Sequence, residues 1–303
     1  MPAGRGVLLD RRVTSDLVDL VALRSYLVAH AVPGLDVVAP LAEGGTVHRR
    51  SVRLPDGRVA GLVVALPADA VGTPAVTAEG APDAVAAVTA VGRRWVGLDA
   101  DPAAGVKALA DDPVLGPLVR SRPHLRVPGS TDGFETAVLV VLGQHVSLAA
   151  GRVFAARLLA AHGSPGPQLD GRRSFPDADV LAALDPVQLQ RTVGVTGARA
   201  RTVVAVARAV ADGTLRLGDP AADLAEVRAA LLALPGVGPW TADLVALRAL
   251  RDPDVFLPGD LVLRKALGAV TARAAATASE AWRPHRSLAV LHLWTRHAID
   301  PPG

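Results

Sequence analysis

Hydrophobic positions follow two different patterns along the chain, and the pattern changes near residue 120. From about residue 134 onward the spacing is helical, and it predicts helices over 134–142, 147–162, 177–184, 186–193, 198–212, 220–234, 240–250 and 261–267. Before residue 120 the pattern is mixed. It predicts helices over 16–31, 83–95 and 101–111 and strands over 46–54, 57–66 and 75–79, with residues 1–12 as a loose tail.

These elements predict a mainly α protein with two domains. The first two strands flank Pro55-Asp56-Gly57, which is a favourable hairpin turn. We therefore expect an α+β domain over residues 1–118, in which a small antiparallel sheet is accompanied by helices. An all-helical domain is expected over 119–303, and a chain of 303 residues is long enough to bury the cores of both.

A glycine hairpin, Leu234-Pro235-Gly236-Val237-Gly238, precedes the predicted helix 240–250. Gly236 and Gly238 can adopt positive φ angles, and Pro239 suits the first position of a helix. The first amides of that helix have no internal acceptor, so together with the hairpin amides they form a candidate anion site. A DNA phosphate bound there would fix the register without reading base sequence. A tight turn between two packed helices is the alternative.

One acidic residue, Asp260, follows Phe256-Leu257-Pro258-Gly259 and precedes the predicted helix 261–267. An aspartate at that position is a good helix N-cap. A capped carboxylate is also held rigidly and stays ionised, so it can stabilise positive charge on a deoxyribose and assist attack by water. The other acids nearby, Asp243, Asp252 and Asp254, are interpreted as surface or turn residues.

The segments 234–242 (LPGVGPWTA) and 256–260 (FLPGD) resemble the helix-hairpin-helix DNA glycosylase superfamily, and within it the bacterial 3-methyladenine DNA glycosylase II family. The resemblance extends to 125–129, 132–135, 142–147, 282–287 and 291–294. It is strong over about residues 120–298 and weak before them. It implies a helix-hairpin-helix glycosylase fold preceded by a small antiparallel sheet domain, with Asp260 as the catalytic residue.

The resemblance also assigns binding residues. Trp240, Trp294 and Tyr26 are expected to line the pocket for a flipped base, although core packing is the alternative for each. Leu244 and Leu261 stand where the family's type member has tyrosines, so we expect a more aliphatic pocket. The expected DNA contacts are Gly236, Val237, Gly238, Trp240, Thr241, Gln144, Arg264, Lys265 and His145, which stands at the position of the residue that fills the gap left by the flipped base.

The reaction implied is hydrolysis of the N-glycosidic bond without strand cleavage. Strand-cleaving members of the superfamily carry a lysine two residues after the second hairpin glycine, and here that position is Trp240. The expected substrates are alkylated purines in double-stranded DNA, namely 3-methyladenine and 7-methylguanine, with hypoxanthine as a further candidate. A non-catalytic helix-hairpin-helix DNA-binding protein and a glycosylase for other lesions are the alternatives.

Composition narrows these expectations. The chain has no cysteine, which excludes disulfides, thiolate metal sites and a cysteine-ligated iron–sulfur cluster. No cofactor is expected, although the carbonyls of Leu232, Leu234 and Val237 are candidate ligands for a monovalent ion, as in relatives. The net charge of +3 is only a weak nucleic-acid signal. No apolar run is long enough for a membrane span and no signal segment opens the chain, so we expect a cytoplasmic monomer without membrane contact.

Overall fold

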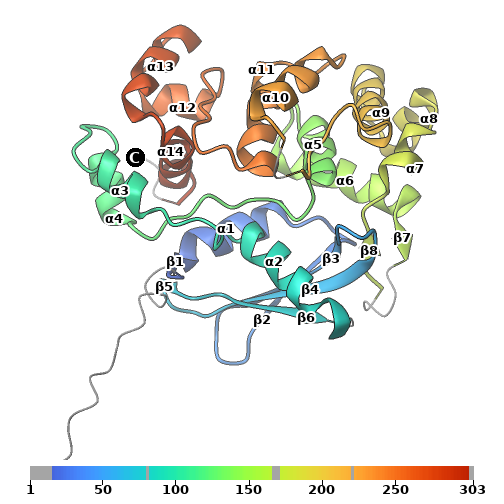
Figure 1. Cartoon of the computed structure of the whole chain (residues 1–303), viewed down its shortest axis with the longest axis horizontal. Coiled ribbons are helices and arrows are strands. Elements are labelled where there is room, and N and C mark those ends of the chain that lie inside the picture. Colours follow the sequence, from blue (N-terminus) through green and yellow to red (C-terminus); the bar gives the residue numbers. More distant parts are fainter. Residues whose placement is uncertain (1–15, 80–81, 166–170, 220–221, 300–303) are drawn as a thin grey trace, which may run out of the picture.

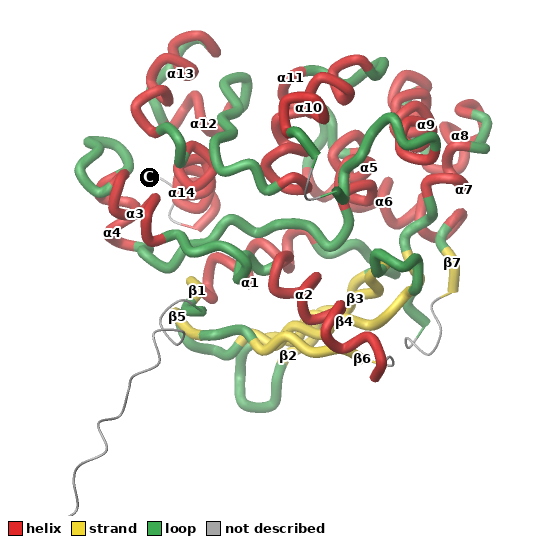
Figure 2. The backbone as a smooth tube through the Cα atoms, in the orientation of Figure 1, coloured by secondary structure: helices red, strands yellow, loops and turns green. Residues whose placement is uncertain are grey.

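A computed structural model describes residues 16–79, 82–165, 171–219 and 222–299 (Figure 1). The tail predicted over residues 1–12 lies outside the described residues. Within them, the strands form one layer at one side of the molecule and helices make up the rest (Figure 2). The mainly α fold with a small antiparallel sheet is as predicted.

The main sheet is antiparallel, with strand order β2-β3-β4-β6. Its strands are β2 (Asp36–Pro40), β3 (Thr46–Arg53), β4 (Val59–Leu66) and β6 (Ala75–Glu79). The predicted hairpin between β3 and β4 is confirmed: the Leu54 amide donates to the Arg58 carbonyl at 2.8 Å. Gly57 adopts a φ of 83°, which a residue without a side chain tolerates best. Strand β2 was not predicted.

Two helices share a core with this sheet. Helix α1 (Leu20–His30) and helix α2 (Val85–Trp95) bury Leu20, Leu27, Val88 and Trp95 in one cluster with Leu62 of β4. A short 3-10 turn, η1 (Pro82–Ala84), precedes α2. The start of α1 is held by a two-stranded pairing of β1 (Val18–Asp19) with β5 (Val71–Gly72).

The remaining helices form two groups, each with its own core. The first group surrounds a core that includes Val138, Leu158 and Val203, and its helices are α5 (Gly133–Leu142), α6 (Leu148–His162), α7 (Ala178–Ala182), α8 (Pro186–Val193), α9 (Gly197–Ala211) and α10 (Leu224–Ala233). A short pairing of β7 (Ser164–Pro165) with β8 (Arg173–Ser174) lies between α6 and α7, in a domain for which the pattern predicted helices and no strand.

The second group joins the C-terminal helices to two helices from earlier in the chain (Figure 1). Its members are α3 (Ala103–Leu109), α4 (Gly116–Ser121), α12 (Leu261–Ala266), α13 (Ala272–Ser279), the 3-10 turn η3 (Glu280–Trp282) and α14 (Arg286–Ile299). Although α3 and the first half of α4 precede the predicted domain boundary at residue 118, Leu109 and Leu115 pack with Trp282 and Leu288.

The hairpin helix connects the two groups. It starts as α11 (Pro239–Val245) and continues as a π-helical turn, η2 (Ala246–Leu250). Val245 and Ala249 face the first core, whereas Ala246 and Leu247 face the second. The predicted helix 240–250 is therefore present, with a change of hydrogen-bond register inside it. None of the helices in the described ranges is long and apolar enough to cross a membrane.

Candidate functional site

The hairpin between α10 and α11 depends on one glycine more than on the other. Gly236 has a φ of 81°, and a Cβ placed on it would lie 2.1 Å from Thr202 Oγ1. Gly238 has a φ of −96° and open space around a hypothetical Cβ, so its conformation does not require glycine. Of the two glycines that can adopt a positive φ, only Gly236 does so. The open surroundings of Gly238 leave the start of α11 accessible.

The start of α11 has the properties of an anion site. Ala242 is the first residue to donate back into the helix, to the Gly238 carbonyl at 3.0 Å, so the amides of Trp240 and Thr241 have no intrahelical acceptor. The Val237 amide, in contrast, donates to the Leu234 carbonyl at 3.2 Å, and the Val237 side chain is buried. Val237 therefore shapes the hairpin, and Trp240 and Thr241 offer the free amides.

A side chain from the loop after α5 holds the hairpin in place. Gln144 Nε2 donates to the Gly236 carbonyl at 3.1 Å and to Thr241 Oγ1 at 2.8 Å. Thr241 is buried, so its hydroxyl serves this contact. The next residue, His145, is exposed and has a φ of 54°, which is rare outside glycine. The structure thus places the two predicted loop residues beside the hairpin, with Gln144 bonded to it and His145 in solvent.

Asp260 is the N-cap of α12. Its Oδ1 accepts a hydrogen bond from the Leu263 amide at 3.0 Å and another from Trp294 Nε1 at 3.3 Å. Its Oδ2 accepts from Trp240 Nε1 at 3.4 Å. The two indoles come from α11 and α14, so three elements far apart in sequence fix one half-buried carboxylate. Both interpretations of Asp260, as a cap and as the acid of a site, are compatible with this geometry.

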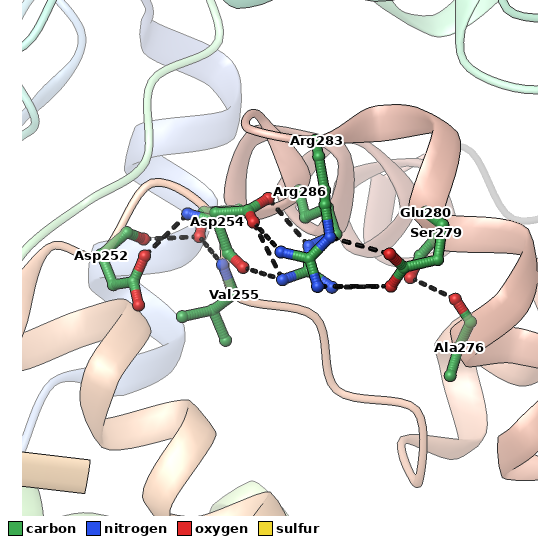
Figure 3. Close-up of polar contacts among 9 residues, drawn as sticks. Asp252, Asp254, Val255, Ala276, Ser279, Glu280, Arg283 and Arg286 are labelled. Atoms are coloured by element: carbon green, nitrogen blue, oxygen red, sulfur yellow. Dashed lines mark hydrogen bonds and ion pairs between the residues drawn. The ribbon is translucent and has the colours of Figure 1, made fainter. Parts of the chain in front are cut away.

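The loop before Asp260 is held by an ionic cluster (Figure 3). The Asp254 carboxylate pairs with Arg286 at 2.8 Å and with Arg283. Both arginines also contact Glu280, and the Val255 amide donates to Ser287 Oγ at 3.0 Å. These contacts tie the loop to the start of α14, so the cap and the indole of Trp294 keep their relative positions. Asp254 is therefore a structural residue of the site.

A cavity of about 530 Å³ lies between the sheet domain and the helices. Its wall includes Tyr26, Trp240, Leu244 and Trp294. Leu261, the fifth expected pocket residue, is 59 % exposed and does not belong to the wall. Asp260 contacts the cavity through the two indoles that line it. Among the expected pocket side chains, only Leu261 points elsewhere, because its position as the first residue of α12 turns it to solvent.

The cavity wall contains charged side chains that the sequence pattern did not indicate. Arg50 of β3 pairs with Glu135 of α5 at 2.6 Å and approaches Asp36 of β2 at 3.3 Å, and all three are buried. Asp36 also bonds to His48 at 3.0 Å. These contacts join the sheet domain to the helical part. The sequence does not distinguish such isolated charged residues in short strands from charged residues at the surface.

Arg50 is the shared ion-pair partner of Asp36 and Glu135, and the pKa values of the two carboxyl groups shift in opposite directions. Burial opposes ionisation of Asp36, but Arg50 and His48 outweigh it and lower the pKa of that carboxyl. Burial raises the pKa of Glu135 to about 7 in spite of Arg50. Asp36 is thus the ionised partner, and Glu135 takes up a proton near neutrality.

Arg248 was also missed, and it lines the same cavity. Arg248 is the charged residue in the otherwise apolar run Leu244 to Leu250, and this isolated charge is the feature of the sequence that could have indicated it. Its guanidinium carbon lies 4.7 Å from the ring centroid of Tyr26 and 5.5 Å from that of Trp294. Arg248 is therefore a part of the aromatic pocket itself.

The remaining expected residues lie around the hairpin and α12. Lys265 is exposed, and Arg264 donates to the Val270 carbonyl at 2.8 Å. Asp243 is buried and pairs with Arg228 at 2.7 Å, so its interpretation as a surface residue is wrong. It links α10 to α11 across the hairpin.

The predicted carbonyl ligands lie at the end of α10 and in the hairpin. The Leu234 carbonyl already accepts the Val237 amide and retains a second lone pair. Carbonyl oxygens suit a hard monovalent cation. Ligation by Leu232, Leu234 and Val237 stays a prediction.

Comparisons with known proteins find relatives in sequence and in fold. Residues 18–132 match the family model described as the AlkA N-terminal domain. A relative from Mycobacterium tuberculosis, "Probable bifunctional transcriptional activator/DNA repair enzyme AlkA", is 43 % identical over 287 residues, which are 91 % of this chain and 55 % of the relative. The Escherichia coli "DNA-3-methyladenine glycosylase 2" is 36 % identical over 187 residues, 62 % of this chain and 66 % of the relative.

The chain belongs to the AlkA-type family of helix-hairpin-helix DNA glycosylases. The fold agrees with that of the 3-methyladenine DNA glycosylase from Archaeoglobus fulgidus, with a TM-score of 0.78, 21 % identity and coverage of 93 % of this chain and 96 % of the other. This AlkA-type chain spans about half the length of the Mycobacterium tuberculosis relative.

Proposed function

We propose that this protein is a monofunctional DNA glycosylase that extrudes alkylated purines from double-stranded DNA and hydrolyses their N-glycosidic bond. The observation that carries the proposal is the position of Asp260. Its carboxylate is fixed by the Leu263 amide and by the indoles of Trp240 and Trp294, and both indoles line a cavity of sufficient size for a purine.

In the proposed binding mode, the hairpin binds the DNA backbone. The loop after α5 fills the gap that the extruded base leaves in the base stack. A phosphate would accept hydrogen bonds from the amides of Trp240 and Thr241, where the open space around Gly238 permits close approach. His145, on the exposed loop beside the hairpin, is the side chain proposed to fill the space left by the extruded base. Flipping costs roughly a few kcal/mol and costs less for damaged bases, which favours lesions.

The proposed chemistry needs one carboxylate and one water. As the bond between C1′ and the base nitrogen breaks, the base leaves with the electron pair and positive charge develops on the sugar. Asp260 stabilises that charge, and a water attacks C1′ and passes its proton to the Asp260 carboxylate. Because the family position of the strand-cleaving lysine holds Trp240, no amine is in place to form a Schiff base.

The test is base release from methylated duplex DNA by the wild type and by Asp260→Asn, with free bases separated by chromatography and strand nicks scored before alkali. Asparagine keeps an acceptor for the Leu263 amide, so the variant should fold. We expect free 3-methyladenine and 7-methylguanine from the wild type without nicks, and a loss of at least about a hundredfold in the variant. DNA binding should be retained, because it depends on the hairpin.

Two outcomes would contradict this proposal. Equal release by the wild type and Asp260→Asn would remove Asp260 from the chemistry. Binding of DNA without release of any base by the wild type would favour a non-catalytic DNA-binding protein or a glycosylase for other lesions.

A further inference from the structure

The loop after α5 is held in place on both sides of His145. On one side, the Gln144 side chain donates hydrogen bonds to two groups of the hairpin. The carbonyl of Gln144, which belongs to the peptide bond before His145, accepts a hydrogen bond from Arg199 of α9. On the other side, the Ser147 hydroxyl caps the start of α6. The position of His145 is therefore fixed by contacts that its own side chain does not make.

The backbone of His145 adopts a conformation that residues with a Cβ rarely adopt. Its φ of 54° lies in the left-handed region, and such conformations persist where the surrounding contacts impose them, often at functional sites. Arg251 is the other described residue besides glycine with a positive φ, and its side chain is bound to Asp99 at 2.6 Å. The imidazole of His145, in contrast, is exposed and has no hydrogen-bond or ion-pair partner within the described ranges.

The loop forms part of the rim of the cavity, but His145 itself does not. Gly143, Val146 and Leu148 line the cavity, whereas His145 is absent from its wall. Val146 and Leu148 are also exposed, so they mark the edge at which the cavity meets solvent. The ring of His145 is therefore directed away from the space for the flipped base. In the proposed binding mode it meets the base stack instead, beside the base that the lesion leaves behind.

We propose that His145 is a specificity-determining residue that recognises the pyrimidine opposite the lesion by a hydrogen bond from its imidazole. This inference rests on the proposed function and extends it from the flipped base to that base's former partner. An alkylated purine leaves a thymine or a cytosine behind, and both carry a carbonyl oxygen at position 2. An imidazole ring offers an N–H donor for that oxygen, whereas an aliphatic side chain in the gap would supply volume alone.

The experiment measures affinity for duplexes in which a tetrahydrofuran residue, a stable analogue of an abasic site, stands opposite either thymine or 2,4-difluorotoluene. The two bases have nearly the same shape, but difluorotoluene is a very weak hydrogen-bond acceptor. The tetrahydrofuran residue carries no base to extrude or to release. The comparison therefore isolates the contact with the opposite base from the pocket and from the chemistry.

Two variants and one control are compared with the wild type. His145→Leu keeps an apolar side chain of similar size and removes both ring nitrogens. His145→Gly removes the side chain and tolerates the positive φ, so it tests the loop without backbone strain. His297→Leu makes the same change at an exposed histidine of α14 that does not line the cavity. Thermal unfolding checks that each variant folds.

We expect the wild type and His297→Leu to bind the thymine duplex about 2- to 10-fold more tightly than the difluorotoluene duplex, the range for one net hydrogen bond. His145→Leu and His145→Gly should bind the two duplexes equally. Equal affinities in the wild type would overturn the inference, and so would a preference that persists in both His145 variants.

Base release from methylated DNA separates this inference from the proposed function. Release by a wild type that binds both tetrahydrofuran duplexes equally would refute the role of His145 and leave the glycosylase assignment in place. A preference for thymine that disappears in both His145 variants, with no base released by the wild type, would support the role of His145 and refute the proposed chemistry.

Discussion

At the scale of single residues, a buried histidine makes the stability of this protein depend on pH. His292 on α14 is 2 % exposed, and its Nε2 has no hydrogen-bond partner among the described residues. Burial lowers its pKa to about 4 from an ordinary value of 6.5. A lowered pKa means that the unfolded chain binds the proton first as the pH falls.

The stabilising contribution of neutral His292 is therefore present above pH 6.5 and is lost between pH 6.5 and about 4. The loss amounts to about 3 kcal/mol, since each pKa unit corresponds to about 1.4 kcal/mol. We expect His292→Leu to lose less of its free energy of unfolding than the wild type between pH 7 and pH 4.5, as measured by urea denaturation. His297→Leu, at the exposed end of the same helix, is the control. Parallel pH profiles for His292→Leu and the wild type would contradict the prediction.

At the scale of the element, the two glycines of the hairpin have different roles. Gly236 is required by the backbone conformation, whereas Gly238 is not. Gly236 needs its positive φ and its closeness to Thr202, so Gly236→Ala should destabilise the protein by about 1–3 kcal/mol. Gly238→Ala should leave stability unchanged within about 0.5 kcal/mol, because its Cβ meets open space and its φ is accessible to alanine. Thermal or urea unfolding of the two variants tests this difference.

Gly238→Asp tests the phosphate site on the same element. Relative to Gly238→Ala it adds a carboxylate at the N-cap of α11, which would repel a phosphate and compete with it for the first amides of the helix. DNA affinity should therefore fall by roughly tenfold relative to Gly238→Ala at low salt. The difference should shrink as salt rises, since exposed charges are screened. Equal affinities of the two variants for duplex DNA would show that no phosphate binds at the hairpin.

The elements also show which parts of the fold the sequence could predict. Helices with a sustained apolar stripe, such as α5, α6 and α9, and the hairpin around Gly57 were predictable because their period and turn residues are local. Strand β2 was not, because Val37 and Val38 are both exposed and the alternation is absent. Helix α4 begins with Gly116-Pro117, which indicates a turn, and its stability comes from packing of Val119.

The same limit applies to the candidate site. The positions of Asp260, Trp240 and Trp294 follow from motifs, and the structure brings these three together. Leu261 was misplaced because a motif gives the position of a residue but not the direction of its side chain. The apolar run marks Arg248 as an unusual charge, but the π-helical register that carries it depends on hydrogen bonds that no residue pattern specifies, so only the three-dimensional structure places it in the pocket.

At the scale of the whole molecule, the cavity exists because the sheet domain and the helices meet over the cluster of Arg50, Asp36 and Glu135. Glu135 sits on α5 and Arg50 on β3, so their 2.6 Å contact joins the two parts. Burial raises the pKa of Glu135 to about 7, above its ordinary 4.5. The stabilisation from its protonated form is complete below pH 4.5 and is lost as the pH rises through about 7.

Glu135→Gln should remove this pH dependence, because glutamine keeps an acceptor for Arg50 and does not titrate. Relative to the variant, the wild type should lose about 3 kcal/mol of unfolding free energy between pH 4.5 and pH 8. The buried histidines cancel in this comparison, because both proteins contain them. Glu79→Gln, which alters a more exposed ion pair of the same sheet with Arg172, is the control. If the ion pair with Arg50 dominated over burial, the variant would instead lose stability relative to the wild type as the pH rises, and the contact between the two parts would depend on an ionised Glu135 and not on a protonated one.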